Sequence, residues 1–480
     1  MALVCETVTG TTTAELRAAR DRAAREADMV ELRVDGVADL DVAGAMQGRT
    51  GPVIVTCRAA WEGGTFKGSE SERIVILNKA ADLGAEFIDV EWRADRSALR
   101  LGERSRLVLS HHDHQGVPSD LGDRVRAMRQ EAGSGAVKIA VTTKTFADCR
   151  RLRDVVGDGK DQVVIGMGHA GTVTRVCPWL YGSLWTYTGT AASGQLSSAE
   201  MIDTYRVKQT TKRTRVYGIL GSPVAHSASP AMHNAAFAAM RIDSVYIPIE
   251  TRDVNEFLAA ASDFGFAGAS VTAPLKTQWT TLGVRVDAAA TQIGAINTLA
   301  RTARGDWEGR NFDADGFLAP LVRRGLQMTG QRVAVLGAGG AARAAVWVLA
   351  RQGAQIEVAA RRMDAATRLA ADLGVTAVTW PPRANWDLLV NATPVGTWPA
   401  VDASPLPREL VRGRVVYDLV YNPAATTLMK LARDAGAEVI GGLEMLVGQA
   451  RAQFEYWTGV PAPESAMEQA ALAFLKRPVE

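Results

Sequence analysis

One lysine in the first half of the chain has the surroundings that amine chemistry needs. Lys138 lies within the apolar run Ala-Val-Lys-Ile-Ala-Val, which is typical of a buried strand. Burial among apolar strands and near arginines disfavours the charged ammonium, and the neutral amine can attack a carbonyl carbon to form a Schiff base. The alternative is a lysine that snorkels from the outer face of a strand.

Other residues of this half could supply the remaining chemistry. His112, on the preceding β-rich run, could act as general acid and base, and Glu62 could orient its ring. Arg33, Arg58 and Arg175 suit an anionic substrate, because the guanidinium fork binds a carboxylate through two hydrogen bonds. The sequence therefore predicts a Schiff-base site for an anionic carbonyl compound.

These residues need a framework that brings them together, and the first 208 residues indicate one. Short β-rich runs alternate here with helical stretches at Thr13–Ala27, Asn78–Leu83 and Val125–Glu131. The eight runs are Ala2–Val8, Met29–Asp35, Val53–Ala59, Phe87–Trp92, Arg106–Asp113, Ala136–Thr142, Gln162–Gly168 and Tyr181–Tyr187. Eight strand–helix units in about 200 residues are typical of a (β/α)8 TIM barrel, an α/β fold.

The ends of the predicted strands are unusually polar. The residues concerned are Glu31, Arg33, Arg58, Asp89, Glu91, His111, His112, Lys138 and Arg175. One such residue is usually a cap or a solvated loop residue, but six strands that converge on one rim favour an active site. We expect His111 to face away from His112, because neighbouring strand residues point to opposite sides.

The second half contains a glycine-rich turn of the kind that binds dinucleotides. Val333-Ala-Val-Leu-Gly-Ala-Gly-Gly-Ala341 joins an apolar strand to a helix at Ala341–Arg351. The glycines allow a tight turn and a close approach of the backbone to a pyrophosphate at the helix N-terminus. The sequence predicts a Rossmann lobe after residue 317.

The next strand of that lobe, Gln355–Ala359, is followed by Arg361 and Arg362. An NAD site usually carries an acid at this position to bind the ribose hydroxyls. Two arginines suit a 2′-phosphate, so NADP is favoured as cofactor. The alternative is an ordinary solvated arginine pair.

Composition limits the other possibilities. A chain of 480 residues with 47% apolar residues should form two or three domains. A net charge of +2 with scattered Lys and Arg gives no nucleic-acid footprint, and no apolar run approaches a membrane span. Four distant cysteines indicate no metal site, and the absence of a signal-peptide pattern favours a reducing cytoplasm. We expect small-molecule substrates, and either a monomer or a homodimer.

A polar, basic run separates two differently organised halves. We expect a barrel at 1–208, a linker at 209–215, a substrate lobe at 216–317 joined by a C-terminal helix within 443–480, and a Rossmann NADP lobe at 318–442. The last helix of the barrel is expected at about 197–207. It runs away from the rim, so the chain should leave the barrel at the opposite face.

The motifs of residues 1–208 resemble type I 3-dehydroquinate dehydratase. They are Glu-Leu-Arg-Val-Asp at 31–35, Thr-Cys-Arg-Ala-Ala-Trp-Glu-Gly-Gly at 56–64, Ser-His-His-Asp at 110–113, Val-Lys-Ile-Ala at 137–140 and Gly-Thr-Val-Thr-Arg at 171–175. The resemblance implies Lys138 as the Schiff-base lysine, His112 as proton shuttle and Glu62 as the partner of His112. The substrate-binding residues that it implies are Glu31, Arg33, Arg58, Arg175 and Gln195. Ala191 departs from the family, which has a serine there, so weaker substrate binding is a possibility left open.

The second half resembles shikimate dehydrogenase from residue 216 to about 460, in motifs such as Gly-Ser-Pro-Val-Ala-His-Ser at 221–227 and Gly-Ala-Ile-Asn-Thr at 294–298. The resemblance implies Lys276 and Asp313 as the catalytic pair, with Asp315 as a competing acid. The implied substrate-binding residues are Ser227, Ser229, Thr272, Asn297, Tyr421 and Gln449. The implied cofactor-binding residues are Gly337, Ala338, Gly339, Gly340, Ala341, Arg361, Arg362 and Thr393. Two departures, Ser270 and Phe312, are expected to reshape the substrate pocket.

The two resemblances imply consecutive reactions. A dehydratase would convert 3-dehydroquinate to 3-dehydroshikimate, and the second half would reduce that ketone to shikimate with NADPH, on the route to aromatic amino acids. One alternative is an NAD-dependent quinate/shikimate dehydrogenase in the second half. Another is a non-catalytic sensor of quinate or shikimate, which the presence of both lysines disfavours.

Overall fold

The computed structural model describes residues 2–157, 159–189, 194–278, 283–382 and 386–476. They form two compact units. The first comprises Met1–Arg215 with Asp243–Thr251 and Glu256–Phe264, and the second comprises Val216–Ile242, Arg252–Asn255 and Gly265–Glu480. Within the described ranges, no helix is both long and apolar enough to span a bilayer.

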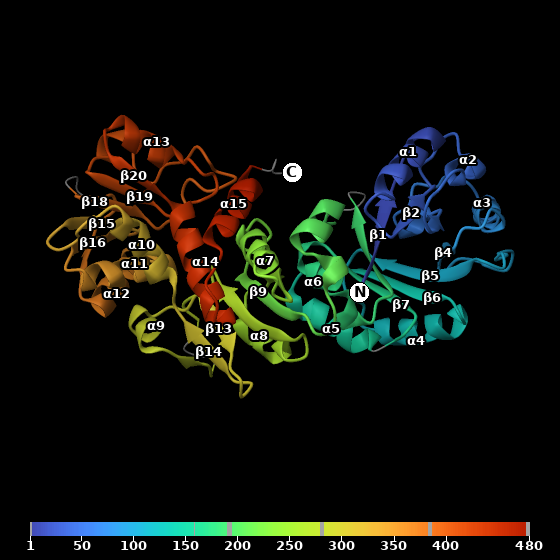
Figure 1. Ribbon diagram of the computed structural model, residues 1–480, viewed down its shortest axis with the longest axis horizontal. Helices are drawn as coiled ribbons and strands as arrows, with labels where there is room; N and C mark the ends of the chain where they lie inside the picture. Colours follow the sequence, from blue (N-terminus) through green and yellow to red (C-terminus); the bar gives the residue numbers. More distant parts are fainter. Residues whose placement is uncertain (1, 158, 190–193, 279–282, 383–385, 477–480) are drawn as a thin grey trace. The chain divides into compact units, whose positions relative to one another are not determined.

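The first sheet is an eight-stranded, nearly closed barrel (Figure 1). Its strands are β1 (Leu3–Val8), β2 (Met29–Arg33), β3 (Val53–Thr56), β4 (Phe87–Glu91), β5 (Arg106–Asp113), β6 (Ala136–Thr142), β7 (Gln162–Met167) and β8 (Trp185–Gly189). They pair in parallel in the order β7-β6-β5-β4-β3-β2-β1-β8. A single parallel bridge, Gln162 to Ser183, joins the two ends of the sheet. The predicted TIM-barrel class is confirmed.

Helices surround the barrel strands (Figure 1). They are α1 (Thr13–Ala23), α2 (Val42–Met46), α3 (Glu70–Asp82), α4 (Leu121–Ala132), α5 (Phe146–Val156) and α6 (Thr172–Val176). A capping box of Ser69 and Glu72 starts α3. The apolar faces of α1, α2 and α3 pack on the outer faces of β2, β3 and β4 in one core cluster that includes Leu16, Leu32 and Leu77. This packing holds the strand ends in place.

Two local predictions in the barrel were wrong. No helix follows β4, because residues 92–105 form turns in which Arg96 donates to the carbonyls of Trp92 and Ala94. The eighth strand begins at Trp185, later than predicted. A 3-10 turn at Pro178–Tyr181 occupies the expected start, and Gly182, with φ of 63°, ends that turn.

The end of the barrel segment also differs from the predicted helix at 197–207. The structure has a π-helical turn at Glu200–Thr204, then Arg206 with φ of 51°, then a 3-10 turn at Val207–Gln209. Lys208 Nζ lies 2.9 Å from Asp28 Oδ1, just before β2 begins. The chain therefore leaves the barrel at the face opposite the rim, as predicted.

After the linker the chain forms a mixed six-stranded sheet with the order β10-β9-β11-β13-β14-β12. Its strands are β9 (Arg215–Gly221), β10 (Ser244–Glu250), β11 (Phe266–Val271), β12 (Arg285–Val286), β13 (Thr298–Arg301) and β14 (Trp307–Arg310). The accompanying helices are α7 (Ser229–Ala239), α8 (Val254–Ala261), α9 (Ala288–Ile293) and α10 (Asp313–Arg323). Ser229 is the first residue of α7, and its N–H donates to Ser227 Oγ at 3.2 Å.

The last sheet is fully parallel, with the order β17-β16-β15-β18-β19-β20. Its strands are β15 (Arg332–Leu336), β16 (Gln355–Ala359), β17 (Thr376–Val378), β18 (Leu388–Asn391), β19 (Val415–Asp418) and β20 (Glu438–Gly441). Its helices are α11 (Gly340–Arg351), α12 (Met363–Leu373) and α13 (Thr427–Asp434), and α14 (Gly442–Thr458) and α15 (Glu464–Leu475) end the chain. This strand order is that of a Rossmann fold, which confirms the prediction.

Candidate active sites

The rim of the barrel encloses a cavity of about 840 Å³. All eight residues predicted for the first site line it: Glu31, Arg33, Arg58, Glu62, His112, Lys138, Arg175 and Gln195. Asp89 and Glu91, the other acids at strand ends, are fully buried beneath the rim. Ala191, the predicted departure, lies outside the described residues. The structure therefore gathers the predicted set at one end of the barrel.

Lys138 points into the barrel and not to the outer face, which rules out the snorkelling alternative. Its Nζ lies 2.9 Å from Glu31 Oε1 and 3.1 Å from Asp89 Oδ2, and the residue is 5% exposed. The charged groups nearest to Lys138 are these two carboxylates, and not the arginines that the sequence led us to expect. Burial, the largest influence, would raise the pKa of Glu31, but the charges of Lys138, Arg33 and Arg58 together hold that pKa below its ordinary value.

Arg58 forms ion pairs with the acids below the rim. Its guanidinium lies 3.0 Å from Asp89 Oδ1 and 3.0 Å from Glu91 Oε1, and it donates to Ser110 Oγ at 2.8 Å. Burial opposes ionisation of Asp89, but the charges of Arg58 and Lys138 hold its pKa below its ordinary value. The carboxylates that face Lys138 therefore remain charged and can accept its protons.

His112 and Glu62 form a buried pair at the rim. His112 Nδ1 lies 2.9 Å from Glu62 Oε2, and the backbone N–H of His112 donates to the same oxygen at 3.1 Å. Burial, followed by the charge of Arg58, lowers the pKa of His112 well below its ordinary value. Burial opposes ionisation of Glu62, but the nearby ring of His111, whose Nδ1 lies 3.7 Å from Oε1, and the hydrogen bond from His112 lower its pKa to about 2. With Nδ1 held as a donor, Nε2 is the basic nitrogen.

Two further side chains near the rim differ in position: His111 lies outside the cavity and Arg175 lines it. His111 Nε2 lies 3.1 Å from Arg124 Nη1 of α4, away from the cavity, as expected from strand alternation. Arg175 is 1% exposed, and burial lowers its pKa to about 10. It donates to Gly168 O at 3.1 Å, while its buried Nε has no partner among the described residues. A buried cation with an unfilled donor at a cavity wall suits an anionic ligand.

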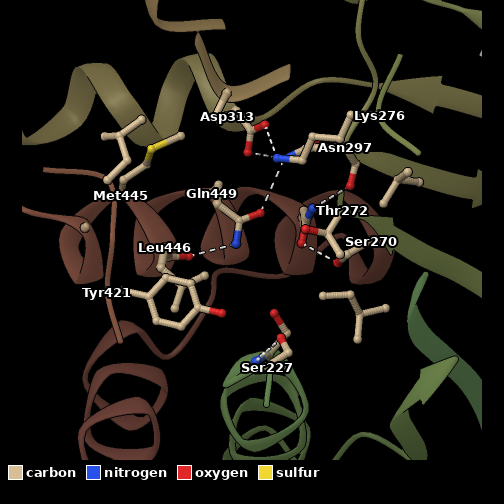
Figure 2. Close-up of a pocket in the computed structure, with 17 residues that line it drawn as sticks. Ser227, Ser270, Thr272, Lys276, Asn297, Asp313, Tyr421, Met445, Leu446 and Gln449 are labelled. Atoms are coloured by element: carbon tan, nitrogen blue, oxygen red, sulfur yellow. Dashed lines mark hydrogen bonds and ion pairs between the residues drawn. The ribbon is translucent and has the colours of Figure 1, made fainter. Parts of the chain in front are cut away.

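The second cavity, of about 150 Å³, lies between α10, α14 and the mixed six-stranded sheet that contains β9 and β11 (Figure 2). All eight predicted catalytic and substrate-binding residues line it: Ser227, Ser229, Thr272, Lys276, Asn297, Asp313, Tyr421 and Gln449. Lys276 Nζ lies 2.5 Å from Asp313 Oδ2, and Asn297 Nδ2 donates to Asp313 Oδ1 at 2.9 Å. Asp315 is exposed, so the competing acid is excluded as the partner of Lys276.

The sequence around Asp313 explains its position. Asn311 Oδ1 accepts from Asp313 N at 2.9 Å, and Asn311 Nδ2 donates to Ala295 O at 2.9 Å. These bonds fix the first turn of α10, where Asp313 is the first helical residue. An ammonium held by an oriented carboxylate can deliver a proton to a developing alkoxide.

Comparison with known proteins agrees with both sites. Residues 4–212 match the family model for type I 3-dehydroquinase, residues 219–299 that for the shikimate dehydrogenase substrate binding domain, and residues 442–472 that for the shikimate 5'-dehydrogenase C-terminal domain. The bifunctional 3-dehydroquinate dehydratase/shikimate dehydrogenase of Arabidopsis thaliana chloroplasts is 32% identical, over 91% of this chain and 79% of its own length. The chain belongs to this bifunctional family.

Two matches to the second half extend this result. A shikimate dehydrogenase (NADP(+)) of Anaeromyxobacter sp. strain Fw109-5 is 44% identical over 55% of this chain and 98% of its own. A solved shikimate dehydrogenase in complex with NADP+ superposes with a TM-score of 0.53 at 32% identity, covering 56% of this chain and 98% of the other. The dehydrogenase part of the bifunctional family thus also occurs as a separate enzyme.

The cofactor turn of this family member is shaped for close approach of a dinucleotide. Gly337 has φ of 113°, and a Cβ there would lie 2.8 Å from Ala392 O. The turn continues through Ala338 and Gly339 to Gly340, where α11 begins, and Ala341 also lines the substrate cavity. Gly337 is therefore needed for close packing against Ala392, an added Cβ at Gly339 would meet nothing within 4 Å, and the turn borders the substrate cavity.

The other predicted cofactor residues lie at the carboxyl ends of neighbouring strands. Arg361 and Arg362 are exposed just after β16. Thr393 follows β18, and its N–H and Oγ1 both donate to Asn391 Oδ1, at 3.1 and 2.7 Å. Ligands of Rossmann folds bind outside these strand ends, so the positions agree with the expected site.

The pocket contains one polar residue that the motifs did not single out. Gln453 is 1% exposed, accepts from Ser270 Oγ at 2.7 Å and donates to Asn297 O at 3.0 Å. It lies four residues after Gln449 on α14, so helical spacing is the signal that could have found it. Of the two departures, Ser270 lines the pocket, whereas the Phe312 ring turns to Tyr456 and is not among the described lining residues.

Proposed function

We propose that this chain catalyses two consecutive reactions: dehydration of 3-dehydroquinate in the barrel and NADPH-dependent reduction of 3-dehydroshikimate to shikimate in the second half. The observation that carries the proposal is the pair of complete lysine sites. Lys138 contacts Glu31 and Asp89 in one cavity, and Lys276 contacts Asp313 in the other. A binding protein without turnover would need neither arrangement.

In the barrel, the amine of Lys138 adds to the ketone carbon of 3-dehydroquinate after its extra proton passes to Glu31 or Asp89. Water leaves, and a cationic iminium remains. His112 Nε2 then removes a proton from the neighbouring carbon and returns it to the departing hydroxyl, which leaves as water. Hydrolysis of the new iminium releases 3-dehydroshikimate and restores the amine. Arg33, Arg58, Arg175 and Gln195 hold the substrate.

In the second half, the six polar residues that line the cavity would surround the substrate: Ser227, Ser229, Thr272, Asn297, Tyr421 and Gln449. Burial raises the pKa of Tyr421, so its phenol stays protonated and donates. Lys276 gives a proton to the oxygen of the reduced carbonyl, while Asp313, itself held by a hydrogen bond from Asn297, keeps the ammonium in place. NADPH would supply the hydride.

The cofactor assignment rests on the chain's own residues and on its relatives. Gly337, Ala338, Gly339, Gly340, Ala341 and Thr393 would hold the pyrophosphate and nicotinamide side. Arg361 and Arg362 provide the charge that a 2′-phosphate needs, and residues 359–362 at the end of β16 include no acid. Relatives named for NADP+ agree with this choice.

We assign the activities to the expected segments: the dehydratase to 1–208, the linker to 209–215, the substrate lobe to 216–317 with α14 and α15, and the cofactor lobe to 318–442. Residues 477–480 lie outside the described part. The cysteines Cys5, Cys57, Cys149 and Cys177 are all unbridged and buried. Their reduced state supports a cytoplasmic enzyme.

A steady-state panel tests the proposal. Purified protein should convert 3-dehydroquinate to 3-dehydroshikimate, and should oxidise shikimate with NADP+ at a much higher kcat/KM than quinate with NAD+. Preference for quinate and NAD+ would instead make the second half a quinate dehydrogenase. Tight binding of either compound without turnover would make the chain a sensor.

A further inference from the structure

The aromatic ring of Tyr187 faces the nitrogen of Lys138 inside the barrel. Lys138 Nζ lies 4.3 Å from the ring centroid. Tyr187 is 4% exposed, comes from β8 and lines the same cavity as Lys138 and Glu31. A cation at this distance over an aromatic face is attracted by the ring quadrupole, and more strongly where water is excluded.

The phenol itself is not suited to acid–base work. Burial, followed by the charge of Glu31, raises the pKa of Tyr187 well above its ordinary value. The hydroxyl therefore stays neutral throughout the reaction. The part of the side chain that can act on Lys138 is the face of the ring.

The ring interaction differs from the carboxylate contacts in one respect that matters for the reaction. The ammonium of Lys138 has three N–H groups, of which two donate to Glu31 and Asp89. After condensation with a ketone the nitrogen keeps a single N–H, so at least one of these bonds is lost. The attraction to the ring needs no N–H, and a planar iminium can lie closer to an aromatic face than an ammonium can.

We propose that the ring of Tyr187 is a catalytic contact that stabilises the cationic iminium on Lys138 relative to the free ammonium. This inference rests on the proposed dehydratase function. It assigns the ring a share of covalent catalysis through an interaction that is stronger in the intermediate than in the resting enzyme.

The experiment is a series of ring-substituted variants of the full-length protein. Tyr187 is replaced by phenylalanine, which keeps the negative face of the ring, and by 3,4,5-trifluorophenylalanine or pentafluorophenylalanine, which nearly conserve shape while weakening that face. Each variant receives saturating 3-dehydroquinate and then borohydride, which reduces the iminium irreversibly. Mass spectrometry of the intact protein gives the trapped fraction.

Phenylalanine should trap as well as tyrosine. The fraction should then fall stepwise with fluorination, by on the order of ten-fold in the iminium-to-free-enzyme ratio across the series. Phe146→pentafluorophenylalanine is the matched control: Phe146 is a buried aromatic of α5 that is not among the described residues lining the cavity. It should trap like wild type.

Each outcome has one meaning. A flat fluorination series, or loss of the adduct in the phenylalanine variant, would overturn the role of the ring while leaving the dehydratase intact. Absence of any adduct in the wild type would instead contradict the Schiff-base function itself. Melting temperatures of all variants show whether a low trapped fraction comes from unfolding, and a Tyr187→Leu variant that melts normally should also trap poorly.

Discussion

The hydrogen bond from His112 Nδ1 to Glu62 leaves Nε2 as the nitrogen of His112 that can act as a base. Glu62 binds Nδ1 and the backbone N–H of His112, so the ring is held in one orientation and one tautomer. The imidazolium formed during proton abstraction is stabilised by the same carboxylate. Its effect on the pKa of His112 opposes those of burial and Arg58, which dominate.

The pH dependence of the dehydratase should reflect this balance. Because the pKa of His112 lies well below its ordinary value, the base stays neutral and kcat/KM should remain flat down to below about pH 6.5. Glu62→Gln removes interactions that raise that pKa, so the acid limb should move to still lower pH. The loss of imidazolium stabilisation should reduce kcat by about ten-fold or more. Rates measured from pH 4 to 8 provide the test.

Asp123→Asn on α4, where the carboxylate is exposed, is the matched control and should keep the wild-type profile. If Glu62→Gln moved the acid limb upward, or left both limb and rate unchanged, the assigned pairing would be incorrect.

Helices α10 and α14 bring the two sides of the dehydrogenase pocket together through a close backbone contact. A Cβ added at Gly316 would lie 2.7 Å from Gln449 N and 2.8 Å from Met445 O. Asp313 is on α10 and Gln449 is on α14, so the spacing of these helices sets the distance across the pocket. The glycine is needed here for approach, not for its backbone angles.

Gly316→Ala should therefore separate the helices. We expect the dehydrogenase half to lose about 1–3 kcal/mol of stability and its kcat/KM for shikimate to fall, because overpacking shifts the backbone that carries Gln449. Dehydratase activity should be unchanged. Thermal unfolding and both steady-state assays on the same preparation give the result.

The same substitution at Gly116, where an added Cβ meets nothing within 4 Å, is the control. Equal behaviour of the two variants would show that the helices tolerate the methyl group and that their contact does not set the pocket.

These elements also show what could be predicted from sequence. Strands such as Ala136–Thr142 were located to the residue because buried parallel strands are continuous apolar runs, and their ends carried the catalytic motifs. The turn after β4 and the displaced β8 were missed because they depend on side chains such as Arg96 and on the turn that starts at Pro178. Tyr187 carries no motif, and only the folded chain brings its ring to Lys138, whereas the helical spacing from Gln449 could have pointed to Gln453.

At the level of the complete chain, each lysine site is built from its own part of the sequence. The described lining of the barrel cavity comes only from residues between Thr7 and Gln195, and that of the second cavity only from residues between Ile219 and Gln453. Each cavity includes a nucleophilic or proton-donating lysine with its own carboxylate partner. Neither reaction needs a residue from the other set.

We therefore expect the two activities to separate by single substitutions. Lys138→Ala should abolish dehydration and keep shikimate oxidation, and Lys276→Ala should do the reverse.

An equimolar mixture of the two variants should then convert 3-dehydroquinate to shikimate with NADPH, because the intermediate is released into solution. Its steady rate should equal that of wild type at half the total protein concentration, which contains the same number of working sites. Wild type should show the same lag before shikimate appears. A shorter lag in wild type, or a mixture far slower than wild type, would mean that 3-dehydroshikimate passes directly between the sites of one chain.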